Sequence, residues 1–204
     1  TGYWAGIEAA DTRYVIHYDG DMFLWQAEGF DWARHAVDLM AAQPLAVSAS
    51  PRLTPPFAEQ LRCADGPSAH EGIPSRPVDG GWAQGYFSTR AFVIDRQKLE
   101  RYLPVAQGPV LFEQLLVKYA RRGYPRSAEM MVWKHLQRSG AHRLVLSSDQ
   151  AWVLHPNWKP EGFAELVPGT QREIQAGRFP AAQYGHAEIQ LEAWKAMLSQ
   201  KAVG

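Results

Sequence analysis

Cysteine is nearly absent from this chain, which has Cys63 alone among its 204 residues. A single cysteine cannot form an internal disulfide, so the fold depends on its core, and the composition fits a reducing compartment. No apolar run reaches the roughly 18–20 residues that are needed to span a bilayer. The first residues also lack a signal-peptide pattern. We therefore expect no membrane span in this chain and a cytoplasmic location, with membrane association through segments missing from the chain as the alternative.

An excess of charge of one sign is also missing, because 21 basic residues balance 21 acidic ones. A nucleic-acid-binding protein normally carries a basic patch, so we expect no nucleic-acid partner. The chain contains no G-x-G-x-x-G, no Walker loop, no G-x-S-x-G and no paired C-x-x-C. The common dinucleotide, P-loop and serine-hydrolase motifs are therefore absent. Cys63 has no catalytic partner near it in the sequence.

What the chain does contain is an alternation of strand-like and helix-like segments, with an ordinary hydrophobic content of 46%. Runs of β-branched and aromatic residues predict strands at 14–18, 45–50, 86–95 and 142–147. Apolar spacing and capping residues predict helices at 3–10, 32–42, 96–102, 110–122, 128–138 and 187–200. Residues 51–81 are rich in Pro, Gly and Ser, which predicts a long irregular loop. The alternation predicts an α/β fold.

Two aspartates follow the first of these strands, in the sequence Asp19-Gly20-Asp21. On extended backbone, side chains two positions apart point to the same side. Carboxylates at the end of a buried strand suit a hard divalent cation that keeps waters and accepts substrate phosphate oxygens. Open α/β sheets also bind ligands at this edge. The pattern therefore predicts a metal site, and a solvated turn at the end of the strand is the alternative.

Several short segments, taken in order, resemble a GT-A-type glycosyltransferase over residues 1–160. They are GIEAADTRYVIHYDGDMF, GYFSTRAFVIDRQKL, SAEMMVWKHLQRSG and a histidine after the last strand. The resemblance implies a mixed central sheet flanked by helices, with 1–166 as the C-terminal part of a catalytic domain and 167–204 as a loop-rich tail with a closing helix. Such enzymes bind the nucleotide base with strands that precede the metal motif. We therefore expect this chain, which starts without Met just before that motif, to lack the nucleotide-binding part.

The resemblance also implies a metal site with three side chains. Asp21 would contact a Mn²⁺ or Mg²⁺ ion directly, and Asp19 would hold the ribose, or the metal through water. His155 would complete the site, since imidazole is a common ligand of first-row metals. The other interpretation of His155 is a histidine in a surface loop.

Glu129, in the first turn of a predicted helix, resembles the catalytic base of inverting members of the family. Many members carry Glu-Asp at this point, whereas Met130 follows Glu129 here. A carboxylate there is also favoured by the helix dipole alone. Gly85 and Tyr86 belong to a segment, 80–86, that resembles the family's glycine-containing acceptor loop, and they would line the donor sugar or the acceptor. The alternative for this segment is a simple turn before a strand.

The implied function is the metal-dependent transfer of a sugar from a nucleotide diphosphate sugar to a carbohydrate or glycolipid hydroxyl, with inversion. Two alternatives stay open. Haloacid-dehalogenase phosphatases also place Asp-x-Asp after a first strand, although Gly-Thr usually follows there and Met22-Phe23 follow here. The second alternative is a non-catalytic carbohydrate-binding or structural fragment.

Overall fold

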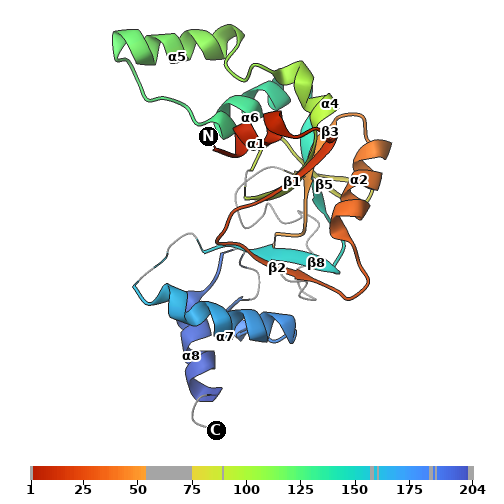
Figure 1. Cartoon of the computed structure of the whole chain (residues 1–204), viewed down its shortest axis with the longest axis vertical. Coiled ribbons are helices and arrows are strands. Elements are labelled where there is room, and N and C mark those ends of the chain that lie inside the picture. The colour runs from red at the N-terminus through yellow and green to blue at the C-terminus, as the bar shows by residue number, and fades with distance from the viewer. Residues whose placement is uncertain are drawn as a thin grey trace.

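The molecule is long, with a central sheet between two helical ends (Figure 1). The computed structural model describes residues 2–53, 75–88, 90–156, 159, 161–183, 186 and 188–201. Helix α5 (Gly108–Ala120) lies at one end, and helices α7 (Phe163–Gln175) and α8 (Leu191–Lys201) lie at the other. Cys63 and most of the predicted loop at 51–81 lie outside the described residues. None of the described helices is long and apolar enough to cross a membrane.

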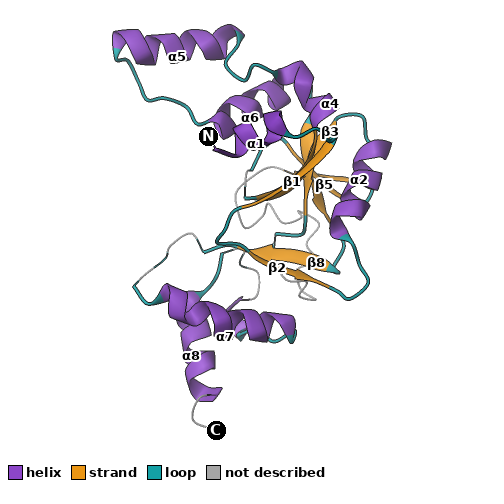
Figure 2. Cartoon of the chain, viewed as in Figure 1, coloured by secondary structure: helices purple, strands orange, loops and turns teal. Residues whose placement is uncertain are grey.

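Six strands form one mixed sheet in the order β1-β6-β3-β7-β5-β4. Their bounds are β1 Tyr14–Tyr18, β3 Ala46–Ser50, β4 Ser75–Val78, β5 Gly81–Gln84, β6 Ala91–Asp95 and β7 His142–Leu146. Strands β3 and β7 run parallel, and the other neighbouring strands run antiparallel. Strands β3, β6 and β7 are buried along their whole length, because helices cover the sheet on both faces (Figure 2). The predicted α/β class, with a mixed sheet flanked by helices, is confirmed.

The two faces of the sheet belong to two separate cores. Helices α1 (Gly2–Ala9) and α6 (Ala128–Ser139) cover one face, and α2 (Trp32–Ala42) covers the other. Along β6, Phe92 and Ile94 belong to the core under α1 and α6, whereas Val93 belongs to the core under α2. This alternation follows from the two-residue period of a strand.

Asp95 fixes β1 against the end of β6. Its carboxylate caps the short helix α4 (Arg96–Leu99) by accepting hydrogen bonds from the N–H groups of Gln97 and Lys98. It also forms an ion pair of 2.8 Å with Arg13, the residue that precedes β1. Burial raises the pKa of Asp95, but the hydrogen bonds and positive charges of Arg13 and Lys98 together outweigh burial and keep that pKa below its ordinary value. The start of β1, and with it the position of the aspartates at its end, is tied to the sheet. A 3-10 turn, η2 (Glu100–Tyr102), follows α4.

A second, two-stranded sheet pairs β2 (Phe23–Gln26) with β8 (Ala151–Leu154) in antiparallel register. It packs on α7 and α8 around a third core that contains Trp152 and Trp194. The rings of Trp152 and Trp25 stack with their centroids 5.7 Å apart. A 3-10 turn, η3 (Ala181–Gln183), lies between the two helices in the chain.

The segment predicted as a glycine-containing loop is largely strand. Strand β5 covers Gly81–Gln84, and the predicted strand at 86–95 begins only at Ala91. A Cβ added to Gly81 would lie 2.1 Å from the carbonyl oxygen of Val145 on β7. Gly81 is therefore explained by close strand packing, and the prediction of a loop from the glycines was wrong for residues 81–84.

Four further elements were not expected from the sequence, namely β2, β4, β8 and α7, and β4 shows that the predicted irregular loop at 51–81 was wrong for residues 75–78. Strand β2 follows the aspartates directly, and α7 occupies a segment that was expected to be loop-rich beyond residue 166. Pro168 and Gly169 gave that segment the appearance of a loop. A Cβ at Gly169 would lie 3.1 Å from Leu198 of α8, so the glycine lets the two helices approach closely.

Candidate functional site

Asp21 and His155 lie side by side although they are far apart in the chain. Oδ2 of Asp21 is 3.8 Å from Nε2 of His155. Strand β2 begins two residues after Asp21 and pairs with β8, with Phe23 opposite Leu154. This antiparallel register brings the residues before β2 next to the residues after β8. Strand pairing therefore assembles the contact, which we call the Asp21–His155 pair.

Among the described residues, one oxygen of the Asp21 carboxylate has partners and the other oxygen has none. Lys159 contacts Oδ2 through its ammonium group. Burial raises the pKa of Asp21, but the hydrogen bond from Lys159 and the charge of His155 outweigh burial, so the pKa lies below its ordinary value. Oδ1 is buried and accepts no hydrogen bond from the part of the chain that the structure describes. A buried polar atom without a partner costs free energy, so Oδ1 fits the position of a ligand to a cation.

Asp19 has a different partner from Asp21. Its Oδ1 is 3.0 Å from Nε2 of His17, the residue two positions earlier on β1. Its backbone N–H donates to the carbonyl of Arg90, and its own carbonyl accepts from the N–H of Met22. Asp19 is thus held at the turn between β1 and β2 by His17. Of the two aspartates, it is Asp21 that contacts His155.

The residues around Asp21 fit a cation that is shared with a substrate. Within the described ranges, no three His, Cys, Asp or Glu side chains gather closely enough to hold a metal ion by themselves. Asp21 and His155 would supply two ligands, one of which would be the unpartnered Oδ1. Mg²⁺ and similar ions bind through one or two carboxylates and take their other ligands from water and substrate phosphates. The donor set suits such an ion better than a closed structural site.

Glu129 and Tyr86 form a second pair, on the α6 side of the sheet. Ser127 caps α6 by accepting a hydrogen bond from the N–H of Met130, which places Glu129 in the first turn. The hydroxyl of Tyr86 donates to Oε1 of Glu129 over 3.1 Å. Burial, followed by the negative charge of Glu129, raises the pKa of Tyr86 to about 12. Tyr86 therefore stays a neutral donor at physiological pH, and we call this contact the Glu129–Tyr86 pair.

A buried arginine underlies the Glu129–Tyr86 pair. Arg143 lies in the middle of the sheet on β7 and is only 2% exposed. Its guanidinium donates to Oε1 of Gln84, its cross-strand neighbour on β5. The guanidinium carbon is also 5.9 Å from the centre of the Tyr86 ring. Sequence reasoning missed Arg143 and Gln84, although a charged residue inside the strand sequence HRLVL was a visible signal.

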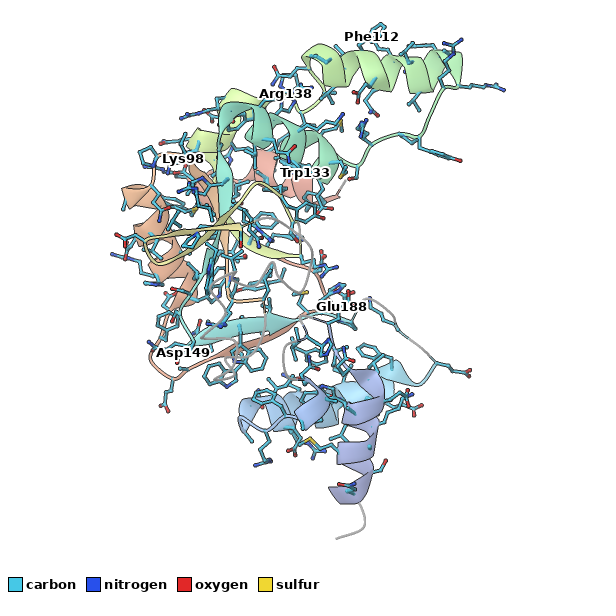
Figure 3. All side chains as sticks on the ribbon, turned by 180° about the vertical axis from the view of Figure 1, so that it is seen from behind. Lys98, Phe112, Trp133, Arg138, Asp149 and Glu188 are labelled. Carbon is cyan, nitrogen blue, oxygen red and sulfur yellow. The ribbon has the colours of Figure 1, made fainter. Side chains whose placement is uncertain are left out.

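Gly85 and Trp133 complete the surroundings of Tyr86. A Cβ at Gly85 would lie 3.5 Å from Cγ of Gln137 on α6, which is an ordinary contact distance. The ring of Trp133, labelled in Figure 3, meets the ring of Tyr86 edge-on at 5.5 Å. Its Nε1 is buried and donates to no side chain or carbonyl of the described residues. The predicted residues thus lie along α6, with Gly85 beside Gln137 and with Tyr86 beside Glu129 and Trp133.

A cavity of about 350 Å³ lies elsewhere, between η2, the start of α5 and α6. Arg101, His135 and Arg138 are among the residues that line it, and none of the predicted site residues does. The imidazole Nε2 of His135 is 2.9 Å from the carbonyl oxygen of Val105. The cavity therefore belongs to neither pair.

No protein-family model matches this chain, and no curated protein and no solved structure matches it either. The function therefore has to be inferred from the two residue pairs and from the fold that positions them. The resemblance to GT-A-type glycosyltransferases stays a prediction.

Proposed function

We propose that this chain is the metal- and acceptor-binding part of a GT-A-type glycosyltransferase, which transfers a sugar from a nucleotide diphosphate sugar to an acceptor hydroxyl. The observation that carries the proposal is the contact between Asp21 and His155, 3.8 Å apart. The resemblance implied that these two residues share a metal site, and nothing in their separate sequence contexts required them to meet. The mixed sheet, with the aspartates at the end of β1, supports the same assignment.

Asp21 and His155 would hold a Mn²⁺ or Mg²⁺ ion, with the unpartnered Oδ1 of Asp21 as a ligand. A cation bound there would neutralise the diphosphate and stabilise the charge on the leaving group. Lys159, whose ammonium contacts Asp21, would move to the diphosphate oxygens and contribute a second positive charge. Asp19, held by His17, would bind the ribose.

Glu129 is the proposed general base. The acceptor oxygen attacks the anomeric carbon as the bond from that carbon to the phosphate oxygen breaks. The proton of the acceptor hydroxyl passes to Glu129, and the nucleoside diphosphate leaves from the opposite face, which gives inversion. Tyr86 keeps Glu129 in place by donating to Oε1. Arg143, beneath the Tyr86 ring, fixes that ring in turn.

Calorimetric titration of uridine diphosphate into the protein, with and without Mn²⁺, tests the proposal. We expect binding that depends on Mn²⁺, and a loss of more than roughly 100-fold in affinity in the Asp21→Ala variant, since even supporting residues of metal sites contribute 10–100-fold. Asp38→Ala on α2 is the matched control, because Asp38 is an exposed aspartate that pairs only with Arg34 among the described residues. Equal affinities of the wild type and Asp21→Ala would refute the assignment.

A metal-free carbohydrate-binding role is the second candidate. It is supported by Lys159, whose ammonium supplies a positive charge to Asp21. This role predicts sugar binding that is insensitive to Mn²⁺ and to chelators. Hydrolysis of a chromogenic phosphate ester, without turnover of a sugar nucleotide, would instead indicate a phosphohydrolase.

A further inference from the structure

Helix α5 leaves most of its large apolar side chains exposed to solvent. On the inner face, Glu113 forms ion pairs of 2.6 Å with Arg126 and 2.9 Å with Lys134 of α6, and Val110 is buried. The exposed large apolar side chains of α5 are Leu111, Phe112, Leu115, Leu116 and Tyr119. An amphipathic helix of a globular protein normally does the opposite, with its apolar stripe against the core.

These exposed side chains form one continuous stripe. They recur at spacings of three and four residues, which places them on one side of a helix. Phe112 is 63% exposed and Tyr119 is 73% exposed, and Tyr124, just beyond the helix, is 91% exposed. Helix α5 projects beyond the sheet and its other helices (Figure 1), and Phe112 lies on its outer side (Figure 3). A contiguous apolar surface of this kind marks an interaction site, whereas scattered exposed residues do not.

The segment around the stripe is basic, although the whole chain has a net charge of zero. Residues 108–126 contain four basic residues and one acidic residue, which gives a net charge of +3. Lys118, Arg121 and Arg122 lie at the C-terminal end of α5, and the ammonium of Lys118 is 5.1 Å from the centre of the Tyr119 ring. Basic and aromatic residues therefore border the apolar stripe.

We propose that α5 binds the surface of an anionic lipid bilayer, with its apolar stripe inserted into the headgroup region. An apolar face bordered by Lys, Arg and aromatic residues is typical of helices that lie in the plane of the interface. The 13 residues of α5 are about 20 Å long, shorter than a hydrocarbon core of roughly 30 Å, so the helix lies flat on the membrane. A second copy of the chain would bring another positive segment against the first, whereas an anionic surface complements the charge. This inference does not depend on the proposed sugar transfer.

Flotation of the whole chain with lipid vesicles tests the proposal. We expect the protein to float with phosphatidylglycerol vesicles, less with phosphatidylcholine vesicles, and less in high salt, because salt screens the basic residues. The double substitution of two apolar residues, Phe112→Ser with Leu115→Ser, should abolish flotation. The double substitution of two basic residues, Lys118→Gln with Arg122→Gln, should weaken binding to phosphatidylglycerol vesicles roughly 30-fold.

Leu45→Ser is the matched control, because Leu45 is 47% exposed and lies away from α5, just before β3. It should float like the wild type. Circular dichroism melting of each variant checks that the exposed substitutions leave the fold intact. Failure of the wild type to float with phosphatidylglycerol, or equal flotation of the Phe112→Ser/Leu115→Ser variant, would overturn the proposal. A dimer that forms without lipid and dissociates in that variant would also overturn it, in favour of a second copy on α5.

Discussion

The Asp21–His155 pair joins two residues that are far apart in the chain, whereas the residues of the Glu129–Tyr86 pair are 43 positions apart. The first pair depends on the register of the small β2–β8 sheet. The second depends on the capped start of α6 and on the end of β5, both of which rest on the large sheet. A change in the small sheet should therefore reach the first pair and leave the second unchanged.

The two pairs also differ in charge. Asp21 contacts Lys159 and His155, so its negative form is stabilised and its pKa is lowered. Tyr86 donates to a carboxylate in a partly buried position, so its neutral form is stabilised and its pKa is raised. In the first pair a carboxylate lies beside Lys159 and His155, and in the second a carboxylate accepts a hydrogen bond from a neutral hydroxyl. A fall in pH should therefore affect the first pair, and a rise in pH should affect the second.

Trp152→Ala should have the largest effect and should disturb the first pair. Trp152 is 1% exposed on β8, stacks on Trp25 and meets Phe179 edge-on at 5.2 Å. Loss of such a buried ring costs about 3–5 kcal/mol. Urea denaturation should show this loss, and Mn²⁺-dependent binding of uridine diphosphate should weaken because β8 positions His155. A change below about 1 kcal/mol would mean that the small sheet does not depend on this core.

Gln84→Ala should have the next largest effect and should disturb the second pair. Gln84 accepts a hydrogen bond from the buried guanidinium of Arg143. Removal of an acceptor from a buried charged donor costs about 2 kcal/mol or more. Urea denaturation measures this loss in the free energy of unfolding. Gln97→Ala is the control, because Gln97 is exposed on α4, and it should stay within about 0.5 kcal/mol of the wild type. Equal stabilities of the two variants would show that Gln84 does not support Arg143.

Alkaline pH should weaken the second pair through Tyr86. The folded pKa of about 12 lies above the ordinary value of 10.0, so the unfolded chain loses its proton first as the pH rises. The stabilisation is complete below pH 10.0 and is lost as the pH rises toward 12. The wild type should therefore lose stability relative to Tyr86→Phe over this range, measured by urea denaturation at each pH. Ultraviolet difference titration should show that Tyr86→Phe lacks one of the late-ionising tyrosines of the wild type, since the pKa of Tyr18 is raised by burial too. An ordinary pKa for Tyr86 would contradict the buried contact with Glu129.

The sequence predicted the parts of the structure that depend on local spacing. The strand at 14–18 and the helix at 32–42 agree with β1 and α2, because apolar periodicity and the Asp31 cap are local signals. The helices at 110–122 and 128–138 were also close to α5 and α6. Strand β5 was missed because Gly81 and the flanking Gly80 and Gly85 give the segment the composition of a loop, and the close approach of β7 explains Gly81.

The candidate site was predicted in its residue types but not in its partners. The resemblance placed Asp19 and Asp21 in one metal site, whereas the structure pairs Asp19 with His17 and Asp21 with His155 and Lys159. Spacing alone cannot show which side chain each aspartate meets, since that depends on the turn after β1 and on the register of β2. Arg143 was missed for a similar reason, because its partner Gln84 lies on a strand that the sequence did not predict.

Acidic pH should have the smallest effect, and it should act on the first pair through Asp21. The folded pKa of Asp21 lies below the ordinary value of 3.8, so the unfolded chain binds a proton first as the pH falls. The stabilisation is complete above pH 3.8 and is lost as the pH falls through the folded pKa. The stability difference between the wild type and Asp21→Asn should therefore be constant near neutral pH and shrink below pH 3.8, measured by urea denaturation. Asp38→Asn on α2 is the control for the removal of an exposed aspartate. If both variants behave alike, Lys159 and His155 do not hold the charge of Asp21, and the first pair loses the electrostatic basis that distinguishes it from the second.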